Sequence, residues 1–224
     1  MMTHDKTGKE TELKLAIESK ADLEKMRQLV GGEGRAPVVQ ENHFFDRADG
    51  VLDRERYACR VRREGDAYVV TVKGPSSTAE GGLLTERAEE EREVSAADAM
   101  AMLEGRQSPL SAFSASSRPA VVERVSQLLG GQPVVYVGGF KNLRTRVDSQ
   151  LAVGGRKTDL VFEFDETTFP GPRVNYELEV EVPAGVDAAL VRVALDDLCR
   201  RVGVTPRAAS SKLKRFMAAI SARP

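Results

Sequence analysis

Glu10-Thr11-Glu12-Leu13-Lys14-Leu15 alternates charged side chains at the even positions with Thr11, Leu13 and Leu15 at the odd ones. Successive side chains of a β-strand point to opposite faces, so this stretch predicts a strand with one charged and one largely apolar face. Residues 59–62 (CRVR) and 176–181 (YELEVE) repeat the alternation. These three stretches therefore predict a sheet whose strands share the same two-faced character.

The same parity recurs along six predicted strands. Polar and charged side chains fall on alternate positions at Arg60 and Arg62; Thr71 and Lys73; Arg87, Glu89, Glu91 and Glu93; Arg144 and Arg146; Asp159, Glu163 and Asp165; Glu177, Glu179 and Glu181. If the apolar faces pack outward beneath helices, the charged faces converge inside, where charge is costly unless it is paired or bound to a ligand. For one strand alone, a solvated outer face is the simpler interpretation. Six strands with shared parity, divided into basic and acidic sets, favour a polar interior suited to a polyanion and its metal ions.

Length and pattern together predict one domain. The chain has 224 residues, 41% of them apolar and 30% charged, and we expect a single domain over 1–224 with a flexible tail over 1–8. About eight strands in mostly antiparallel order fit a closed β-barrel, which has room inside for side chains or one small ligand. The predicted fold class is therefore mainly antiparallel β within an α+β fold, an eight-stranded closed barrel with helices packed outside.

The element boundaries follow from the periodicity and the cap residues. We expect strands over 10–18, 38–46, 56–63, 67–73, 83–94, 133–139, 142–148, 158–166 and 174–182. Helices are expected over 20–30, 118–129, 187–202 and 207–221, with a short one from Ser95 to Leu103. Ser19 and Ser95 are the predicted caps of the first two helices.

Composition also limits the expected binding partners and cellular compartment. The formal net charge of −1 gives no global field for nucleic acid, so any affinity for anions must come from local clusters. Cys59 and Cys199 lack metal-ligand spacing and are interpreted as buried thiols in a reducing compartment. With neither a signal peptide nor a membrane-spanning run in the sequence, we expect a cytoplasmic protein that binds neither membrane nor nucleic acid. The sequence leaves the oligomeric state open, a monomer included.

The motifs, taken in order, resemble the CYTH superfamily, the triphosphate tunnel metalloenzymes. Residues 10–14 match its ExExK signature, and residues 71–75 are similar to its TxKGP turn. Further correspondences are Arg60-Val61-Arg62, Arg87-Ala88-Glu89 with Glu91, Arg144-Thr145-Arg146, Phe164-Asp165-Glu166, Glu177-Leu178-Glu179 and Lys212. Within the superfamily the chain is most similar to plant and bacterial tripolyphosphatases, although Val147, Asp148 and Ser149 stand where an aromatic residue usually follows the K/RxR element.

The resemblance implies a metal-dependent hydrolase acting on phosphoanhydride bonds, which releases the terminal phosphate of inorganic tripolyphosphate with Mg²⁺ or Mn²⁺. Substrate would be bound by Lys14, Arg60, Arg62, Lys73, Arg87, Arg144, Arg146 and Lys212. Metal ligands would come from Glu10, Glu12, Asp165, Glu177, Glu179 and Glu181, and which two of the last three ligate directly stays open. Lys212, Glu12 and Glu181 would be catalytic, and Lys212 could protonate the leaving oxygen if a crowded cationic site lowers its pKa.

Other functions fit the same architecture. A thiamine triphosphatase or a class IV adenylyl cyclase would need a pocket for an organic group, and the chain has no Trp and four Tyr for stacking. A polyphosphate- or nucleotide-binding module without turnover would gain nothing from carboxylates that face phosphate. His4, His43, Glu90, Lys214 and Arg215 are interpreted as structural or solvated residues.

Overall fold

The computed structural model describes residues 7–78, 82–171 and 174–221. His4 and residues 1–6 of the predicted tail lie outside this part, whereas Thr7 and Gly8 belong to the first strand. The described strands are β1 (Thr7–Ile17), β2 (Val38–Arg47), β3 (Ala58–Glu64), β4 (Ala67–Lys73), β5 (Ser77–Thr78), β6 (Leu84–Val94), β7 (Val134–Val153), β8 (Arg156–Thr168), β9 (Val174–Glu181) and β10 (Arg207–Ala208). The described helices are α1 (Lys20–Leu29), α2 (Val51–Arg54), α3 (Ala96–Leu103), the 3-10 helix η1 (Pro109–Ala112), α4 (Ala120–Leu129), α5 (Ala188–Val202) and α6 (Lys212–Ser221).

The strands form one sheet in the order β10-β1-β9-β8-β7-β2-β3-β4-β6-β5, and β1 also pairs with β6. Because β1 and β6 lie near opposite ends of this order, their pairing closes the sheet. Eight of the described strands therefore make a closed antiparallel β-barrel. The short strands β5 and β10 extend it from β6 and β1. The predicted fold class is confirmed.

The contacts between residues divide the structure into two compact units, each with its own apolar core. Unit 1 comprises Met1–Glu10, Gln40–Ser76 and Arg87–Lys141. Unit 2 comprises Thr11–Val39, Ser77–Glu86 and Asn142–Pro224. The expectation of a single domain over 1–224 stays a prediction.

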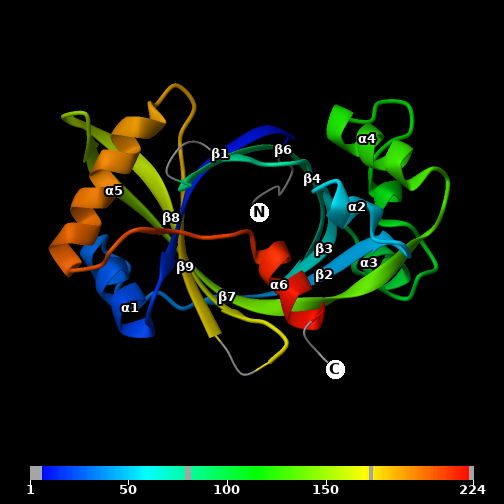
Figure 1. The fold of residues 1–224 in the computed structure, drawn as a ribbon, viewed down its shortest axis with the longest axis horizontal. Helices are drawn as coiled ribbons and strands as arrows, with labels where there is room; N and C mark the ends of the chain where they lie inside the picture. The colour runs from blue at the N-terminus through cyan, green and yellow to red at the C-terminus, as the bar shows by residue number, and fades with distance from the viewer. Residues whose placement is uncertain (1–6, 79–81, 172–173, 222–224) are drawn as a thin grey trace. The chain divides into compact units, whose positions relative to one another are not determined.

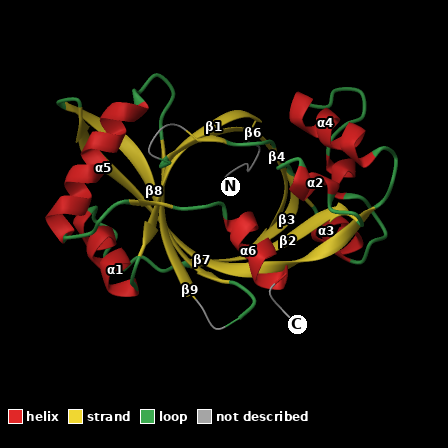
Figure 2. Cartoon of the chain, in the orientation of Figure 1, coloured by secondary structure: helices red, strands yellow, loops and turns green. Residues whose placement is uncertain are grey.

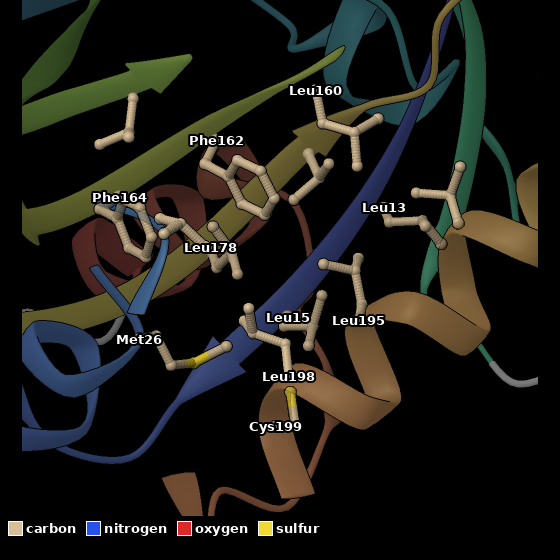
Figure 3. Packing of buried hydrophobic residues seen from close by; sticks show 14 of the residues in the cluster. Leu13, Leu15, Met26, Leu160, Phe162, Phe164, Leu178, Leu195, Leu198 and Cys199 are labelled. Atoms are coloured by element: carbon tan, nitrogen blue, oxygen red, sulfur yellow. The ribbon is translucent and has the colours of Figure 1, made fainter. Parts of the chain in front are cut away.

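In unit 2 the apolar rows of three strands are covered by two helices. Leu13 and Leu15 of β1 lie in the same buried cluster as Phe162 and Phe164 of β8, and α1 and α5 pack against each other over this cluster (Figure 3). Figure 1 shows α1 and α5 beside β8 and β9. The alternation predicted from residues 10–15 is therefore present, because the leucines enter the core and leave the charged residues on the other face.

In unit 1 the apolar faces of β3 and β4 are covered by α2, α3 and α4, which group together in Figure 2. Val61, Val70 and Val72 are fully buried with Met102 of α3 and Val122 of α4. The two central strands thus have an apolar and a charged face, and the helices lie on the apolar one.

Several predicted boundaries are confirmed by their caps. The side chains of Ser19 and Ser95 accept hydrogen bonds from the backbone N–H groups of Asp22 and Asp98 at the starts of α1 and α3. Each serine also donates to the corresponding aspartate, over 2.7 Å and 2.6 Å respectively. These reciprocal bonds fix where each helix begins.

Two predicted boundaries were wrong. Residues 133–139 and 142–148 are not separate strands, since β7 runs unbroken from Val134 to Val153. A Cβ atom at Gly139 would lie 2.1 Å from the carbonyl oxygen of Asn42, so this glycine permits a close approach of β2 rather than a turn. The last helix begins at Lys212 rather than 207, because Arg207 and Ala208 pair with β1.

Candidate functional site

The charged residues of unit 1 form rows across three strands. In the register of β3, β4 and β6, Arg60 lies opposite Thr71, and Thr71 lies opposite Glu91. One step along, Lys73 lies opposite Glu89. Because directly opposite residues of antiparallel strands share a face, this register brings the side chains together as the parity predicted. We call Arg60, Arg62, Lys73, Arg87, Glu10, Glu89 and Glu91 the basic cluster.

Arg60 and Arg62 both approach Glu91. Each arginine has its Nη2 atom 3.6 Å from Glu91 Oε1. Arg60 also donates from Nη1 to Asn42 Oδ1 and from Nη2 to Thr71 Oγ1, both over 3.1 Å. Yet the Nε–H groups of Arg60 and Arg62 are buried and find no hydrogen-bond acceptor among the described residues. Buried donors of this kind are costly, and an anion placed there would satisfy them.

Lys73 and Arg87 form the other part of the basic cluster. Lys73 Nζ lies 2.6 Å from Glu89 Oε2 and 3.6 Å from Glu10 Oε2, and Arg87 Nε donates to Glu10 over 2.8 Å. Glu10, predicted to be a metal ligand, is therefore bound to two cations here. All four cations of this cluster are at least partly buried.

The pKa values of Glu89 and Glu91 are shifted in opposite directions. Burial raises the pKa of Glu89 to about 8, against the effect of Lys73 and with the help of its hydrogen bond to Glu10. Burial also opposes ionisation of Glu91, but Arg62, Lys73 and Arg60 outweigh it and lower its pKa to about 2. Desolvation and the neighbouring Arg62 lower the pKa of Arg60 to about 10. A local excess of positive charge near Glu91 follows from these directions.

The charged residues of unit 2 form a second cluster, on β1, β7, β8, β9 and α6. Lys14 lies opposite Glu179 in the register of β1 and β9, and its Nζ atom is 2.9 Å from Glu179 Oε1 and 3.0 Å from Glu12 Oε1. All three side chains are buried. We call Glu12, Glu163, Asp165, Glu177, Glu179, Lys14, Arg144, Lys212 and Arg215 the acidic cluster.

Helix α6 brings two cations to the charged face of β8 and β9. Lys212 Nζ lies 2.8 Å from Asp165 Oδ2, 2.9 Å from Glu177 Oε1 and 2.8 Å from Glu179 Oε1. Arg215, one helical turn later, pairs with Glu177, and its Cζ atom lies over the ring of Phe169, 5.4 Å from the ring centroid. Ser211 accepts a hydrogen bond from the N–H of Lys214 at the first turn, which fixes the start of this helix at Lys212.

Arg144 connects the remaining carboxylates. Its Nε and Nη2 atoms donate to the two oxygens of Asp165 over 2.8 Å and 2.6 Å, a bidentate pair. The same Nη2 atom donates to Glu179 over 2.7 Å, and Nη1 pairs with Glu163. Contacts with Asp165, Glu179 and Glu163 thus fix the orientation of the guanidinium group.

The electrostatics at Lys212 contradict one expectation. A role for Lys212 as proton donor required a crowded cationic site that lowers its pKa, but its neighbours are acidic. Burial lowers the pKa, and Asp165, Glu177 and Glu179 raise it well above its ordinary value. Lys212 is therefore a persistent ammonium group rather than a proton donor near neutral pH.

The structure brings most predicted site residues into one of the two clusters. Two are different: Arg146 is exposed and pairs with Asp148, and Glu181 is exposed at the end of β9. Glu90 was expected in solvent but is buried, and burial raises its pKa. Arg215 was expected on a solvated face, yet it is only partly exposed beside Glu177. Its position three residues after Lys212, on the same helical face, is the signal that could have identified it.

Uncharged polar residues lie between the charges, and the predicted parity included Thr71 but not Asn42, Asn142 or Thr167. Asn42 and Thr71 contact Arg60, and Asn142 and Thr167 lie fully buried beside Asp165. Parity alone places Thr71 and Thr167 on the charged faces. Asn142 has the parity of Arg144 on β7 and could have been found in the same way.

The family resemblance implies a divalent metal, and the acidic cluster supplies suitable donors. Glu12, Asp165, Glu177 and Glu179 are buried carboxylates, the hard oxygen ligands that Mg²⁺ and Mn²⁺ prefer. Burial and the neighbouring Glu179 raise the pKa of Glu177, against the effect of Lys212, as expected where negative charge is crowded. As they stand, no three His, Cys, Asp or Glu side chains among the described residues are arranged to hold a metal ion, since ammonium groups lie between the carboxylates. The donor set therefore fits a divalent ion by its chemistry, provided Lys14 or Lys212 changes partners.

Comparison with known proteins places these features in a family. The chain is similar to a Hippeastrum protein described as an adenylyl cyclase candidate with a dominant triphosphatase activity, at 24% identity over 93% of this chain and 95% of that one, with a TM-score of 0.75. It is also similar to an adenylate cyclase candidate from Bacillus halodurans, at 21% identity over 93% and 98% of the two chains and a TM-score of 0.66. No curated protein gives a significant match, and no helix in the described residues is long and apolar enough to cross a membrane. The CYTH domain family matches residues 8–200, and the chain therefore belongs to this family.

Proposed function

We propose that the protein hydrolyses the terminal phosphate of inorganic tripolyphosphate in a reaction that depends on Mg²⁺ or Mn²⁺. The observation that carries the proposal is the pair of buried Nε–H groups on Arg60 and Arg62, which find no acceptor among the described residues. A linear triphosphate offers closely spaced anionic oxygens, and arginine forks bind such oxygens bidentately. The substrate is a small molecule in this proposal.

The basic cluster binds phosphate. Arg60 and Arg62 bind phosphate oxygens through their guanidinium groups, while Lys73 and Arg87 act as further positive charges. Thr71 and Asn42 orient Arg60 by accepting from its two Nη groups. Binding exchanges the contacts of these cations with Glu89, Glu91 and Glu10 for contacts with the substrate.

The acidic cluster holds the divalent ion and orients cations toward the substrate. Glu12, Glu177 and Glu179 would ligate, with Glu10, Asp165 and Glu181 as the further candidates. The bound ion would neutralise charge on the phosphoryl oxygens and lower the pKa of a coordinated water. Lys212, Arg144 and Lys14 stabilise negative charge on the phosphate chain, and no nucleophilic side chain is required.

Two other enzymes of the same fold are the alternatives. A class IV adenylyl cyclase is favoured by the description of the Hippeastrum and Bacillus halodurans proteins as cyclase candidates. A thiamine triphosphatase would need an apolar wall for the thiazole ring, and the aromatic pair Phe44–Phe140, with ring centroids 5.4 Å apart, is the described feature that favours it. A binding module without turnover is disfavoured by the number of buried carboxylates.

One assay separates these functions. Purified protein with Mg²⁺ is given tripolyphosphate, ATP or thiamine triphosphate, and released phosphate, pyrophosphate and cyclic AMP are measured. We expect the highest kcat/KM for phosphate release from tripolyphosphate. Cyclic AMP and pyrophosphate from ATP would instead indicate a cyclase, and binding without any product would indicate a module that lacks turnover.

A further inference from the structure

Asp165 is enclosed by donors on both of its oxygens. Oδ1 accepts from Asn142 Nδ2 over 2.8 Å and from Arg144 Nε over 2.8 Å. Oδ2 accepts from Arg144 Nη2 over 2.6 Å and lies 2.8 Å from Lys212 Nζ. The side chain is fully buried, so its orientation is decided by these partners and by the groups that orient them.

A directed chain of hydrogen bonds leads to this carboxylate. Thr167 Oγ1 donates to Asn142 Oδ1 over 2.7 Å, which leaves the amide N–H of Asn142 turned toward Asp165. Asn142 and Thr167 are each only 1% exposed. A buried threonine and asparagine on neighbouring strands are costly unless paired, and here they pair with each other and with a carboxylate.

We propose that Thr167 and Asn142 are positioning residues, which hold Asp165 in the orientation that places Lys212 and Arg144 for the reaction. The carboxylate of Asp165 decides which way the amide of Asn142 lies, because a reversed amide would set its carbonyl against that carboxylate, and Thr167 holds the amide in place by donating to its carbonyl oxygen. Asn142 in turn fixes the plane of Asp165, and this plane determines where Arg144 binds bidentately and where the ammonium group of Lys212 lies. The inference rests on the proposed function, since it gives these residues a part in that reaction.

The local register supports a positioning role. Thr167, Asp165 and Glu163 alternate along β8, opposite Asn175, Glu177 and Glu179 of β9. Glu163, Glu177 and Glu179 contact Arg144 or Lys212 directly, whereas Thr167 reaches them only through Asn142 and Asp165. A residue such as Thr167 that acts through others affects where the charged groups lie, and adds no charge of its own.

The test is a cycle of variants around Thr167. Thr167→Val removes the hydroxyl at nearly constant volume, and we expect kcat for tripolyphosphate to fall by about 10- to 100-fold with a smaller change in KM. Thr167→Ser keeps a hydroxyl and should restore most of kcat. Thr168→Val, at the exposed neighbouring position of the same strand, is the matched control and should leave both constants unchanged.

Combining Thr167→Val with Asp165→Asn shows whether Thr167 acts through Asp165. If it does, the valine adds little further loss of kcat once Asp165 is changed, so the two effects are not additive. Additive losses, or a Thr167→Val protein with wild-type kcat, would overturn the inference. If the wild-type protein releases no phosphate, the proposed function fails by itself. The wild type, the two single variants Thr167→Val and Asp165→Asn, and the double variant are then compared by urea unfolding. Non-additive changes in the free energy of unfolding support the chain of contacts, and additive changes refute it.

Discussion

Lys212 shows how the surroundings of one residue decide its chemistry. Three carboxylates surround its ammonium group and raise its pKa, so the lysine carries its charge throughout the neutral range. Its expected role is to stabilise charge on the phosphate chain rather than to deliver a proton. The consequence is a testable split between kcat and KM.

We predict that Lys212→Ala lowers kcat by more than it raises KM. A lost charge-assisted contact costs about 1.5–3 kcal/mol, so kcat should fall by about 10- to 100-fold. Lys214 is exposed on another face of the same helix, and Lys214→Ala should be nearly silent. Steady-state kinetics with tripolyphosphate provide the measurement, and equal effects in the two variants would reduce Lys212 to a general contribution of surface charge.

Glu89 and Glu91 predict opposite dependences of stability on pH. The pKa of Glu89 is raised to about 8 in the folded protein, so the folded state holds a proton that the unfolded chain loses at lower pH. The free energy of unfolding should therefore fall as pH rises from about 5 toward 8, and Glu89→Gln should reduce this fall. The pKa of Glu91 is lowered to about 2, so its contribution is present above the unfolded value and is lost only in acid.

Glu91→Gln is thus the control for Glu89→Gln, on the same face of β6. Its cost in stability should be the same at about pH 5.5 and pH 8.5 and should shrink below about pH 4. Urea unfolding at these pH values measures both variants. A similar slope against pH in the wild-type and Glu89→Gln proteins would contradict the assignment of a proton to Glu89.

At the scale of elements, β3 carries its binding arginines on one face and packs its other face into an apolar core. Arg60 and Arg62 lie on the charged face of this strand, and the intervening Val61 is buried in the apolar core. Arg63 has the parity of Val61, but near the end of the strand it is exposed. The strand therefore offers a matched set of arginines.

We predict that Arg60→Ala and Arg62→Ala each weaken tripolyphosphate binding by about 10- to 100-fold. Arg63→Ala should change the affinity by less than about twofold, apart from a small screening effect that salt removes. Isothermal titration calorimetry at low and physiological salt measures all three. Wild-type affinity in both Arg60→Ala and Arg62→Ala would place these guanidinium groups outside the substrate site.

The parity of side chains was enough to predict much of the candidate site. Buried leucines alternating with charged residues along β1 assigned each side chain to a face, and the pairing of Lys14 with Glu179 follows from two such faces in register. What parity could not give was the start of α6. Arg207 and Ala208 pair with Ala16 and Leu15 of β1 instead of beginning the helix. This pairing depends on a strand near the start of the chain, so the local sequence around residue 207 does not indicate it.

At the scale of the whole molecule, the sequence predicted a closed antiparallel barrel, and the strand order bears this out. The order also joins strands distant in the sequence, such as β1 and β9, but the barrel itself could be predicted because hairpins and alternation are local properties. The partners of individual charges could not, because a carboxylate such as Asp165 takes its neighbours from β7 and α6, which are distant in sequence. In this structure, cations pair with five of the expected metal ligands, namely Glu10, Glu12, Asp165, Glu177 and Glu179, and their role as ligands stays a prediction.

We predict that activity as a whole depends on a divalent ion held by the acidic cluster. Glu12→Gln keeps the shape of this buried side chain but removes its charge, so kcat should fall by at least about 100-fold while the fold is retained. Phosphate release and circular dichroism measure the two effects. Full activity in excess EDTA, or unchanged turnover in Glu12→Gln, would rule out the metal mechanism.

The lysines placed between carboxylates have a thermodynamic consequence for ligand binding. Lys14 and Lys212 pair with Glu12, Glu177 and Glu179, so within the acidic cluster neither a cation nor an anion alone can bind without breaking an ion pair. When a divalent ion takes the carboxylates, the released ammonium groups become available to phosphate, and each ligand lowers the cost of binding the other. Linkage requires this coupling to be reciprocal, so tripolyphosphate should tighten the binding of Mn²⁺ by the factor by which Mn²⁺ tightens that of tripolyphosphate. The acidic cluster would then bind either ion weakly when it is alone and more tightly when the other ion is present.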